Sequence, residues 1–336
     1  MDRRITSYAL AMLAMLMAFF LPLSATAAAQ SSSQQYDWHV FSSAETGVHA
    51  ESVSDFAQGA DGSLWVGTRN NGVVRLHNGT WKVFNTDNSP LPNNEIESFA
   101  LGADGTLWVG TWGGGLARVQ NGAWHVFNTD NSALPNNNVW SLAQGADETL
   151  WIGTWGGGLA RLQKGQWQVF NANNSALPNN DVWALAQGAD NTLWIGTGGG
   201  LARLQKGQWQ VFTTDNSDLP TKGVLSLAQD NDGTLWIGTN GGGLARLRNG
   251  NWKVFTPSNS QLPSNVVMSL AHGPDGSLWI GTGGGLVRLN DGKWQVFTTD
   301  NSGLPSNVVL SIARGTDGSL WIGTDGGGFV RLRSGS

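Results

Sequence analysis

After residue 36, apolar and polar residues alternate in short runs, and the same runs return at a nearly constant interval. The motif Leu-Trp-(Ile/Val)-Gly-Thr is followed 42 or 43 residues later by its next copy, and a second motif, Trp-x-Val-Phe, keeps the same interval. The first motif places its tryptophan at Trp65, Trp108, Trp151, Trp194, Trp236, Trp279 and Trp321. Alternation with a period of two is typical of half-buried β-strands. A repeat of 40–45 residues with several short strands is typical of a β-propeller blade.

Each repeat is expected to contribute four antiparallel strands. In one copy these are an inner strand at 139–143, a second strand at 150–154, a third strand at 159–162 and the outer Trp-x-Val-Phe strand. Asp-Gly, Asn-Gly and Lys-Gly pairs join them, and glycine supplies the positive φ that such turns require. No segment of the repeats shows a helical period. The sequence therefore predicts an all-β fold.

The two ends of the repeat array decide whether it closes. The last repeat stops at residues 331–336 without an outer strand, and the surplus outer strand lies at Tyr36–Phe41. We predict that residues 36–41 join residues 308–333 to complete the last blade. Residues 36–336 would then form one seven-bladed β-propeller, and closure would remove both open sheet edges.

The first residues have the order of a targeting segment. Two arginines precede an apolar run from Tyr8 to Leu23, and a stretch of small residues follows. This order is typical of a secretory signal peptide, predicted at residues 1–29 with a polar linker at 30–35. An uncleaved anchor is the alternative, because the run is near the lower limit for crossing a bilayer. A periplasmic or secreted protein without a membrane span after cleavage is expected.

Composition removes several classes of function. The net charge is −5, only 13% of the residues are charged, and there is no cysteine. Forty per cent apolar residues and 18 tryptophans argue against disorder, and the scattered lysines and arginines lack the basic stripe that nucleic acid needs. The histidines are not at metal-ligand spacing, and the acidic turns lack the oxygen pattern of a calcium loop. We expect no metal, no cofactor and no nucleic-acid partner.

The unit Asp-Gly-Ser-Leu-Trp-Ile-Gly-Thr-x-Gly-Gly-Gly-Leu-x-Arg-Leu, as at 275–289 or 317–332, resembles the two-component regulator propeller repeat. This resemblance covers residues 36–336. It implies a periplasmic sensor propeller of the kind attached to a membrane helix and a histidine kinase that responds to extracellular glycans. The chain shows no such kinase after residue 336, so we expect signalling through an envelope protein partner such as a separate sensor kinase. A more distant resemblance, through the Asp-Gly-x-Leu-Trp turn, is to the streptogramin lyase propeller.

Comparison between the repeats separates scaffold from candidate site. The fourteen tryptophans of the two motifs and one arginine per repeat recur, so we expect them to be structural. Two positions vary and should share one face: the residue after Gly-Thr, expected to be missing in the fourth and sixth repeats, and the start of the inner strand. The candidate site residues at these positions are Trp112, Trp155, Trp140, Trp183, Arg69, Glu97, Asn240 and Asp325.

These residues predict an aromatic patch beside polar groups near the mouth of the central channel. Such surfaces bind sugar rings and flat ligands, so we expect a sensor module for a glycan or another small polar ligand. For Trp140 and Trp183, packing inside the channel is an equal alternative. The other functions considered are a protein–protein interaction scaffold and, less favoured, a streptogramin-lyase-like enzyme. Only His49 with Glu51 or Glu97 approximates the His and Glu of a lyase, and no catalytic residue is assigned.

Overall fold

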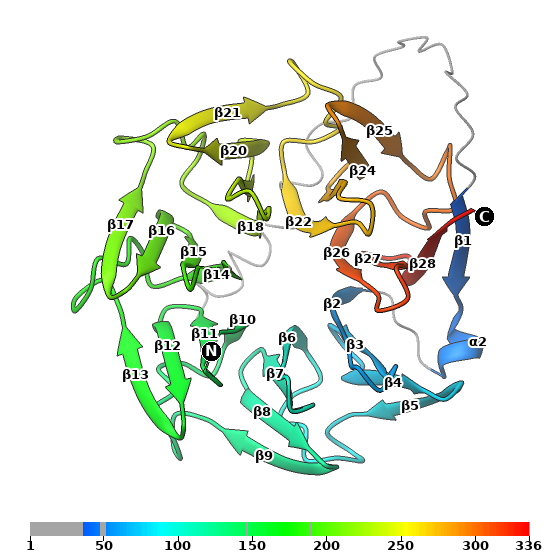
Figure 1. Cartoon of the computed structure of the whole chain (residues 1–336). Helices are drawn as coiled ribbons and strands as arrows, with labels where there is room; N and C mark the ends of the chain where they lie inside the picture. The colour runs from blue at the N-terminus through cyan, green and yellow to red at the C-terminus, as the bar shows by residue number, and fades with distance from the viewer. Residues whose placement is uncertain (1–35, 48–51, 146, 189, 336) are drawn as a thin grey trace, which may run out of the picture. The chain divides into compact units, whose positions relative to one another are not determined.

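Seven four-stranded antiparallel sheets stand side by side around one axis in residues 36–336 (Figure 1). The computed structural model describes residues 36–47, 52–145, 147–188 and 190–335. The signal peptide and linker predicted at 1–35 lie outside the described residues. The prediction of a seven-bladed, all-β propeller is confirmed.

The strands of each blade follow one another from the axis outward. Blade one contains β2 (Val53–Gln58), β3 (Leu64–Thr68), β4 (Val73–His77) and β5 (Thr80–Phe84). Blade two contains β6 (Ile96–Leu101), β7 (Leu107–Thr111), β8 (Gly115–Gln120) and β9 (Ala123–Phe127). Blade three contains β10 (Val139–Gln144), β11 (Leu150–Thr154), β12 (Gly158–Gln163) and β13 (Gln166–Phe170). Blade four contains β14 (Val182–Gln187), β15 (Leu193–Thr197), β16 (Gly200–Gln205) and β17 (Gln208–Phe212).

The remaining three blades complete the ring. Blade five contains β18 (Val224–Gln229), β19 (Leu235–Thr239), β20 (Leu244–Arg248) and β21 (Asn251–Phe255). Blade six contains β22 (Val267–His272), β23 (Leu278–Thr282), β24 (Gly285–Asn290) and β25 (Lys293–Phe297). Blade seven contains β26 (Val309–Arg314), β27 (Leu320–Thr324), β28 (Phe329–Ser334) and, as its outer strand, β1 (Tyr36–Phe41).

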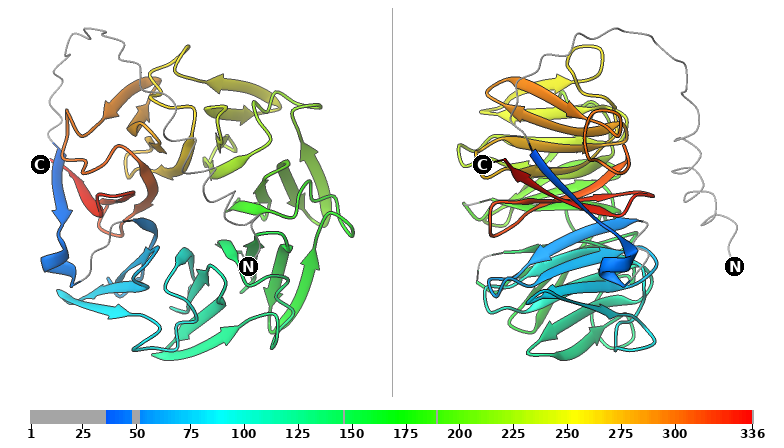
Figure 2. Two further views of the ribbon diagram at one scale, coloured as in Figure 1. Left: turned by 180° about the vertical axis from the view of Figure 1, so that it is seen from behind. Right: turned by 90° about the vertical axis from the view of Figure 1, so that its right-hand side faces the viewer.

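The ring is closed by the first described strand, as predicted. Strand β1 pairs antiparallel with β28, from Tyr36 opposite Ser334 to Phe41 opposite Phe329 (Figure 2). The inner strand β26 of blade seven also packs against the inner strand β2 of blade one. The N-terminal and C-terminal parts of the propeller therefore share one sheet.

The last three residues of the Leu-Trp-Ile-Gly-Thr motif have structural roles that blade three illustrates. Ile152 is fully buried. A Cβ on Gly153 would lie 2.6 Å from the Val182 side chain, so glycine lets the inner strand of blade four approach. The hydroxyl of Thr154, also fully buried, donates to the carbonyl of Gly158 at 2.8 Å and closes the following loop.

The motif tryptophans pack at the boundaries between blades. Trp236 of blade five lies in one apolar cluster with Leu278 and Leu289 of blade six. At the same boundary, the rings of Phe255 and Trp294 are 5.4 Å apart. The expected structural role of these tryptophans is confirmed by such clusters between blades.

The repeated arginine makes a cation–π contact in addition to polar contacts. The guanidinium of Arg246 lies 5.9 Å from the ring centre of Trp236, and five other blades repeat this arrangement. In blade six the arginine, Arg288, forms an ion pair with Asp275. Its role is therefore structural, as expected.

One element departs from the sequence-based prediction. A single helical turn, α2 (Ser43–Thr46), follows β1, although no helix was expected. Ser42 caps it, Glu45 completes a capping box, and Gly47 ends it at φ 76°. The described part of the chain contains no helix with the length and hydropathy needed to cross a membrane.

Candidate functional site

The variable loop residues of all seven blades lie on one face of the propeller. In each blade, the residue after the Gly-Thr motif donates its backbone N–H to a carbonyl just before the inner strand of the same blade; for Trp112 and Glu95 the distance is 3.0 Å. The seven pairs are Arg69–Ser52, Trp112–Glu95, Trp155–Asn138, Gly198–Asp181, Asn240–Gly223, Gly283–Val266 and Asp325–Val308. We call the side formed by these loops and by the connections between blades the loop face.

This hydrogen-bond register corrects one expectation from the sequence. The loop position is not missing in blades four and six; glycine occupies it, as Gly198 and Gly283, and the loop is shorter beyond it. A Cβ on Gly198 would lie 3.2 Å from the ring of Trp183. The glycine therefore makes room for that ring.

The four tryptophans outside the motifs form one contiguous cluster on the loop face, here called the Trp cluster. The ring of Trp112 is 5.7 Å from that of Trp140 and 5.8 Å from that of Trp155, at interplanar angles of 75° and 72°. Trp140 and Trp155 are 5.3 Å apart, and Trp155 and Trp183 are 6.1 Å apart. All four side chains are partly exposed, so the cluster is neither fully solvated nor part of the blade cores.

Trp183 ends the cluster at the boundary between blades four and five. Its ring lies against Gly223, where a Cβ would be 3.1 Å from the ring and 3.1 Å from Cβ of Asn240. Asn240 is exposed. The structure therefore brings Asn240 beside the Trp cluster.

Arg69, Glu95 and Glu97 interact electrostatically, and the backbone of Glu95 is hydrogen-bonded to Trp112 at the other end of the cluster. Burial raises the pKa of Glu97 to about 7; the Arg69 guanidinium opposes the shift and the Glu95 carboxylate adds to it. Burial also raises the pKa of Glu95. Two carboxylates against one guanidinium give this group a net negative charge at high pH.

Asp325 lies apart from the Trp cluster. Its carboxylate accepts a hydrogen bond from the Ser52 hydroxyl, which links blade seven to blade one. The backbone of Ser52 also accepts from the N–H of Arg69 at 3.1 Å. Asp325 therefore adds charge to the loop face without a contact to the rings.

Two acidic residues of this surface were missed by the sequence comparison. Glu95 and Asp181 occupy the position whose carbonyl accepts the conserved loop hydrogen bond, and they are partly buried. Burial raises the pKa of Asp181, while a hydrogen bond from the Gly156 backbone lowers it. Comparison of the repeats could have identified Glu95 and Asp181, because their position also varies. Other blades have Asn138, Gly223, Val266 and Val308 there.

The described histidines do not converge on the loop face. His77 Nδ1 lies 2.8 Å from the Ser63 hydroxyl, which also donates to Asp61, but Ser63 is 1% exposed and every blade has a Ser or Thr at this turn. His272 lies at the opposite end of an inner strand, 3.3 Å from Asp230. His49 and Glu51 lie outside the described residues. No group of three or more His, Cys, Asp or Glu suited to a metal occurs among the described residues.

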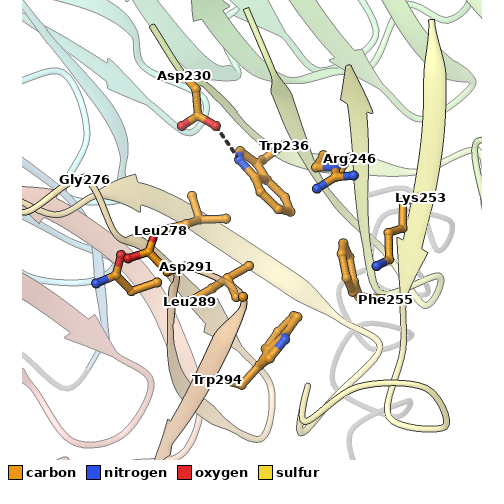
Figure 3. Close-up of a pocket in the computed structure, with 12 residues that line it drawn as sticks. Asp230, Trp236, Arg246, Lys253, Phe255, Gly276, Leu278, Leu289, Asp291 and Trp294 are labelled. Atoms are coloured by element: carbon orange, nitrogen blue, oxygen red, sulfur yellow. Dashed lines mark hydrogen bonds between the residues drawn. The ribbon is translucent and has the colours of Figure 1, made fainter. Parts of the chain in front are cut away.

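Two cavities lie between blades, away from the Trp cluster. One, of about 290 Å³ between blades five and six, is lined by Asp230, Trp236 and Trp294 (Figure 3). The other, of about 370 Å³, has the same setting between blades four and five, with Trp194 and Trp252 in its wall. Because both are lined by motif residues that recur in the repeats, they belong to the scaffold.

The fold and the site define a class: a closed propeller of seven nearly identical blades whose variable side chains gather on one face. Six segments match the family model described as two component regulator propeller, at residues 90–113, 133–156, 176–199, 218–241, 261–284 and 303–326. Six segments of the chain thus match two-component regulator propeller repeats, and the resemblance found in its sequence is confirmed.

Solved structures share the fold of this chain. The extracellular domain of the putative hybrid two component system BT3049 from B. thetaiotaomicron superposes with a TM-score of 0.77 at 21% identity, over 89% of this chain and 42% of that one. The corresponding domain of BT4673 from the same organism gives a TM-score of 0.72 at 25% identity, over 90% of this chain and 40% of that one. The chain therefore spans less than half the length of these domains.

A lyase shares the fold at lower identity. Virginiamycin B lyase from Staphylococcus aureus superposes with a TM-score of 0.72 at 16% identity, over 89% of this chain and 99% of the lyase. At this identity the similarity is one of fold alone. No curated protein matches the chain in sequence.

Proposed function

We propose that this propeller is an extracytoplasmic ligand-binding sensor module that recognises a glycan or another small polar ligand on its loop face. The observation that carries the proposal is the Trp cluster. Four large rings lie in contact on one face, outside the recurring scaffold, and remain partly exposed. An exposed aromatic surface with polar neighbours such as Arg69 and Asn240 suits stacking and directional hydrogen bonds.

The repeat family and the fold support the sensor context. Similar propellers occur in the extracellular domains of putative hybrid two component systems. The predicted signal peptide would direct the chain to the periplasm or the outside of the cell. Signalling would then require an envelope partner, and a separate sensor kinase is the partner we propose.

The structure gives less support to an enzyme. A lyase-like site would need His and Glu side chains to converge, and the described histidines contact other groups. These contacts are His39 with Glu45, His77 with Ser63, His125 with the ring of Phe127 and His272 with Asp230. A binding module is therefore the function we propose. Turnover of a streptogramin substrate by the purified protein would contradict this choice.

The test removes the two loop tryptophans together. Trp112→Asn with Trp155→Asn, copying the residue that blade five has as Asn240, is expected to abolish binding to a glycan panel, measured by intrinsic fluorescence and calorimetry. The melting temperature should fall while the fold is kept, because the two substitutions remove four ring pairs of about 0.5–1.5 kcal/mol each but leave the blade cores intact. Leu310→Asn, at the inner-strand position of blade seven, is the matched control and should bind normally. A double variant that unfolds would assign the Trp cluster to the scaffold.

A further inference from the structure

Charge is distributed very unevenly between the two faces of the propeller. Among the described residues, only Arg69 and Lys222 carry a positive charge on the loop face; the other lysines and arginines lie within strands or on the turns of the opposite face. The carboxylates on the loop face are Glu45, Asp87, Glu95, Glu97, Asp130, Asp181, Asp215, Asp218, Asp300 and Asp325. A face with this imbalance attracts cations and repels anions.

The same imbalance holds next to the Trp cluster. Glu95 lies just before β6, and Glu97 lies at the register shift between Ile96 and Ser98. The two carboxylates interact electrostatically with each other, and Arg69 opposes both. The Glu95 carbonyl accepts the backbone N–H of Trp112, which places the backbone of Glu95 beside that of the first tryptophan of the cluster. At the other end, Asp181 accepts a hydrogen bond from the backbone of Gly156, the residue after Trp155. Carboxylates therefore flank the rings on both sides.

The rings themselves suit a cation. The face of an indole carries negative charge density, and a cation within about 6 Å of its centre is attracted to it. Trp112 meets both Trp140 and Trp155 edge to face, so the rings of the cluster face in more than one direction. The scaffold already uses this chemistry, with an arginine 5.0–6.0 Å from a tryptophan ring centre in six blades.

We propose that the ligand of the loop face is a small organic cation, with an alkylammonium group held against the Trp cluster and neutralised by Glu95, Glu97 and Asp181. This proposal rests on the proposed function and narrows its ligand class. Alkylated ammonium groups fit better than inorganic cations, because they are weakly hydrated and can leave water for an aromatic surface. Neutral sugars could stack on the rings and donate hydroxyl hydrogen bonds to the carboxylates, but they would gain no attraction between opposite charges.

The experiment compares two probes of the same shape that differ in charge, choline and 3,3-dimethylbutan-1-ol. Calorimetric titration of the full chain at pH 8 and low salt is expected to give about tenfold tighter binding of choline, the size of one cation–π contact with a nearby carboxylate. Glu95→Gln with Glu97→Gln should remove most of this preference. Asp300→Asn, a loop-face carboxylate outside the cluster, is the matched control and should change affinity less than twofold.

A pH series adds a second readout. The quaternary ammonium of choline does not titrate, whereas Glu97, faced by Arg69 and Glu95, loses its proton near pH 7. Choline affinity should therefore rise between pH 6 and pH 8 in the parent, and this rise should be absent in Glu97→Gln. A flat profile in the parent contradicts the role of Glu97.

Other outcomes separate this proposal from the proposed function. Equal affinity for the two probes, or binding of a neutral glycan that choline does not displace, overturns the cation assignment and leaves a ligand-binding module. If a tetralysine peptide binds more tightly than choline and competes with it, the surface binds the amines of a protein. This outcome also overturns the assignment to a small organic cation. Absence of binding by both probes and by the glycan panel overturns both proposals.

Discussion

Asp55 lies on the inner strand of blade one, at a position where the other blades have Ser or Ala. Its carboxylate accepts the backbone N–H of Phe56 at 2.8 Å and, across the boundary to blade two, that of Phe99 at 2.7 Å. Burial raises the pKa of Asp55 to about 7. In blade six, Ser269 accepts the corresponding N–H, from Ile312 at 3.0 Å. A neutral hydroxyl can therefore make the bond across the boundary.

We expect Asp55→Ser to stabilise the propeller at pH 8 and to flatten its stability profile. Because the folded-state pKa of Asp55 exceeds the unfolded value near 4, the folded state holds an extra proton between about pH 4 and pH 7. The contribution of Asp55 to the free energy of unfolding is fully present below pH 4. It falls as the pH rises to 7, by an amount on the order of 4 kcal/mol. Denaturant midpoints at pH 5 and pH 8.5 measure about two-thirds of this fall.

Two comparisons make this result interpretable. Asp87→Ser, on an exposed loop, should leave the profile of the parent unchanged. Glu97, whose pKa is also raised to about 7, is present in both proteins. The free energy of unfolding of Asp55→Ser should therefore still depend on pH, through Glu97, as that of the parent does. A variant as pH-dependent as the parent would mean that Asp55 is ionised in the folded protein.

Residue roles were predictable wherever the blades could be compared with one another. Recurrence identified the motif tryptophans as scaffold, and variation singled out Trp112, Trp140, Trp155 and Trp183, which the structure brings into contact. The ring angles were not predictable, because they depend on packing across three blades. The position of Gly198 was misread since sequence spacing does not reveal which residue of a shortened loop keeps the hydrogen bond.

At the scale of elements, β1 is the strand whose role depends most on distant residues. Its side chains cover the boundary between blades six and seven: Tyr36 lies 5.5 Å from Phe297, and Trp38 lies at the same distance from that ring. Its backbone pairs with six residues of β28. These contacts join parts of the chain that are almost three hundred residues apart.

Deleting residues 36–41 is expected to lower the melting temperature by many degrees and to cause aggregation. The deletion would leave β28 as an unpaired edge and expose the apolar cluster around Phe297 and Leu332. Scanning calorimetry and light scattering measure the two effects. Val40→Thr, at a side chain 42% exposed, should behave like the parent. If the deletion protein melts at the same temperature as the parent, β1 is not needed to close the ring.

The strand pattern was predictable because period-two alternation and turn pairs are local signals. The type I′ turn at Lys164 and Gly165, with φ values of 47° and 77°, is what a Lys-Gly pair between two strands suggests. Helix α2 was overlooked, although Ser42 and Glu45 carry the capping-box spacing. A single turn has no apolar period, so only its cap could have revealed it.

At the scale of the whole molecule, the two ends of the propeller meet where other blades have a continuous hairpin. Arg333 pairs with Asp37, the counterpart of the pair Gln163–Gln166 that flanks the turn in blade three. The next residues, Ser334 and Gly335, stand where that turn has Lys164 and Gly165. Blade seven is therefore an ordinary blade with its outer hairpin cut.

We expect a circular permutant to restore that hairpin. The chain 52–335 followed directly by residues 37–47 should fold and melt within a few degrees of the chain 36–336, because Ser-Gly can form the same two-residue turn. Circular dichroism and calorimetry compare the two proteins. The chain 52–335 alone is the control and should aggregate. A permutant that melts far below its parent would show that the cut in blade seven serves stability.

The number of blades and the closure of the ring followed from counting repeats and locating the surplus strand. The charge asymmetry of the two faces did not, because it requires knowing which side each loop occupies. Once the strand directions are known, the acidic residues between blades fall on the loop face and most lysines and arginines fall elsewhere. Whole-molecule electrostatics is thus a property of topology as much as of composition.

The pairing of β1 with β28 also has a mechanical consequence. Tyr36 lies opposite Ser334, so both ends of the propeller emerge at the same end of this pair of strands. Tension applied between the ends would open the interstrand hydrogen bonds one after another, as a zipper opens, and would not shear them together. The strand that completes the ring is thus the first to detach under load. Its release would uncover one sheet edge while the other six blades still hold their four strands.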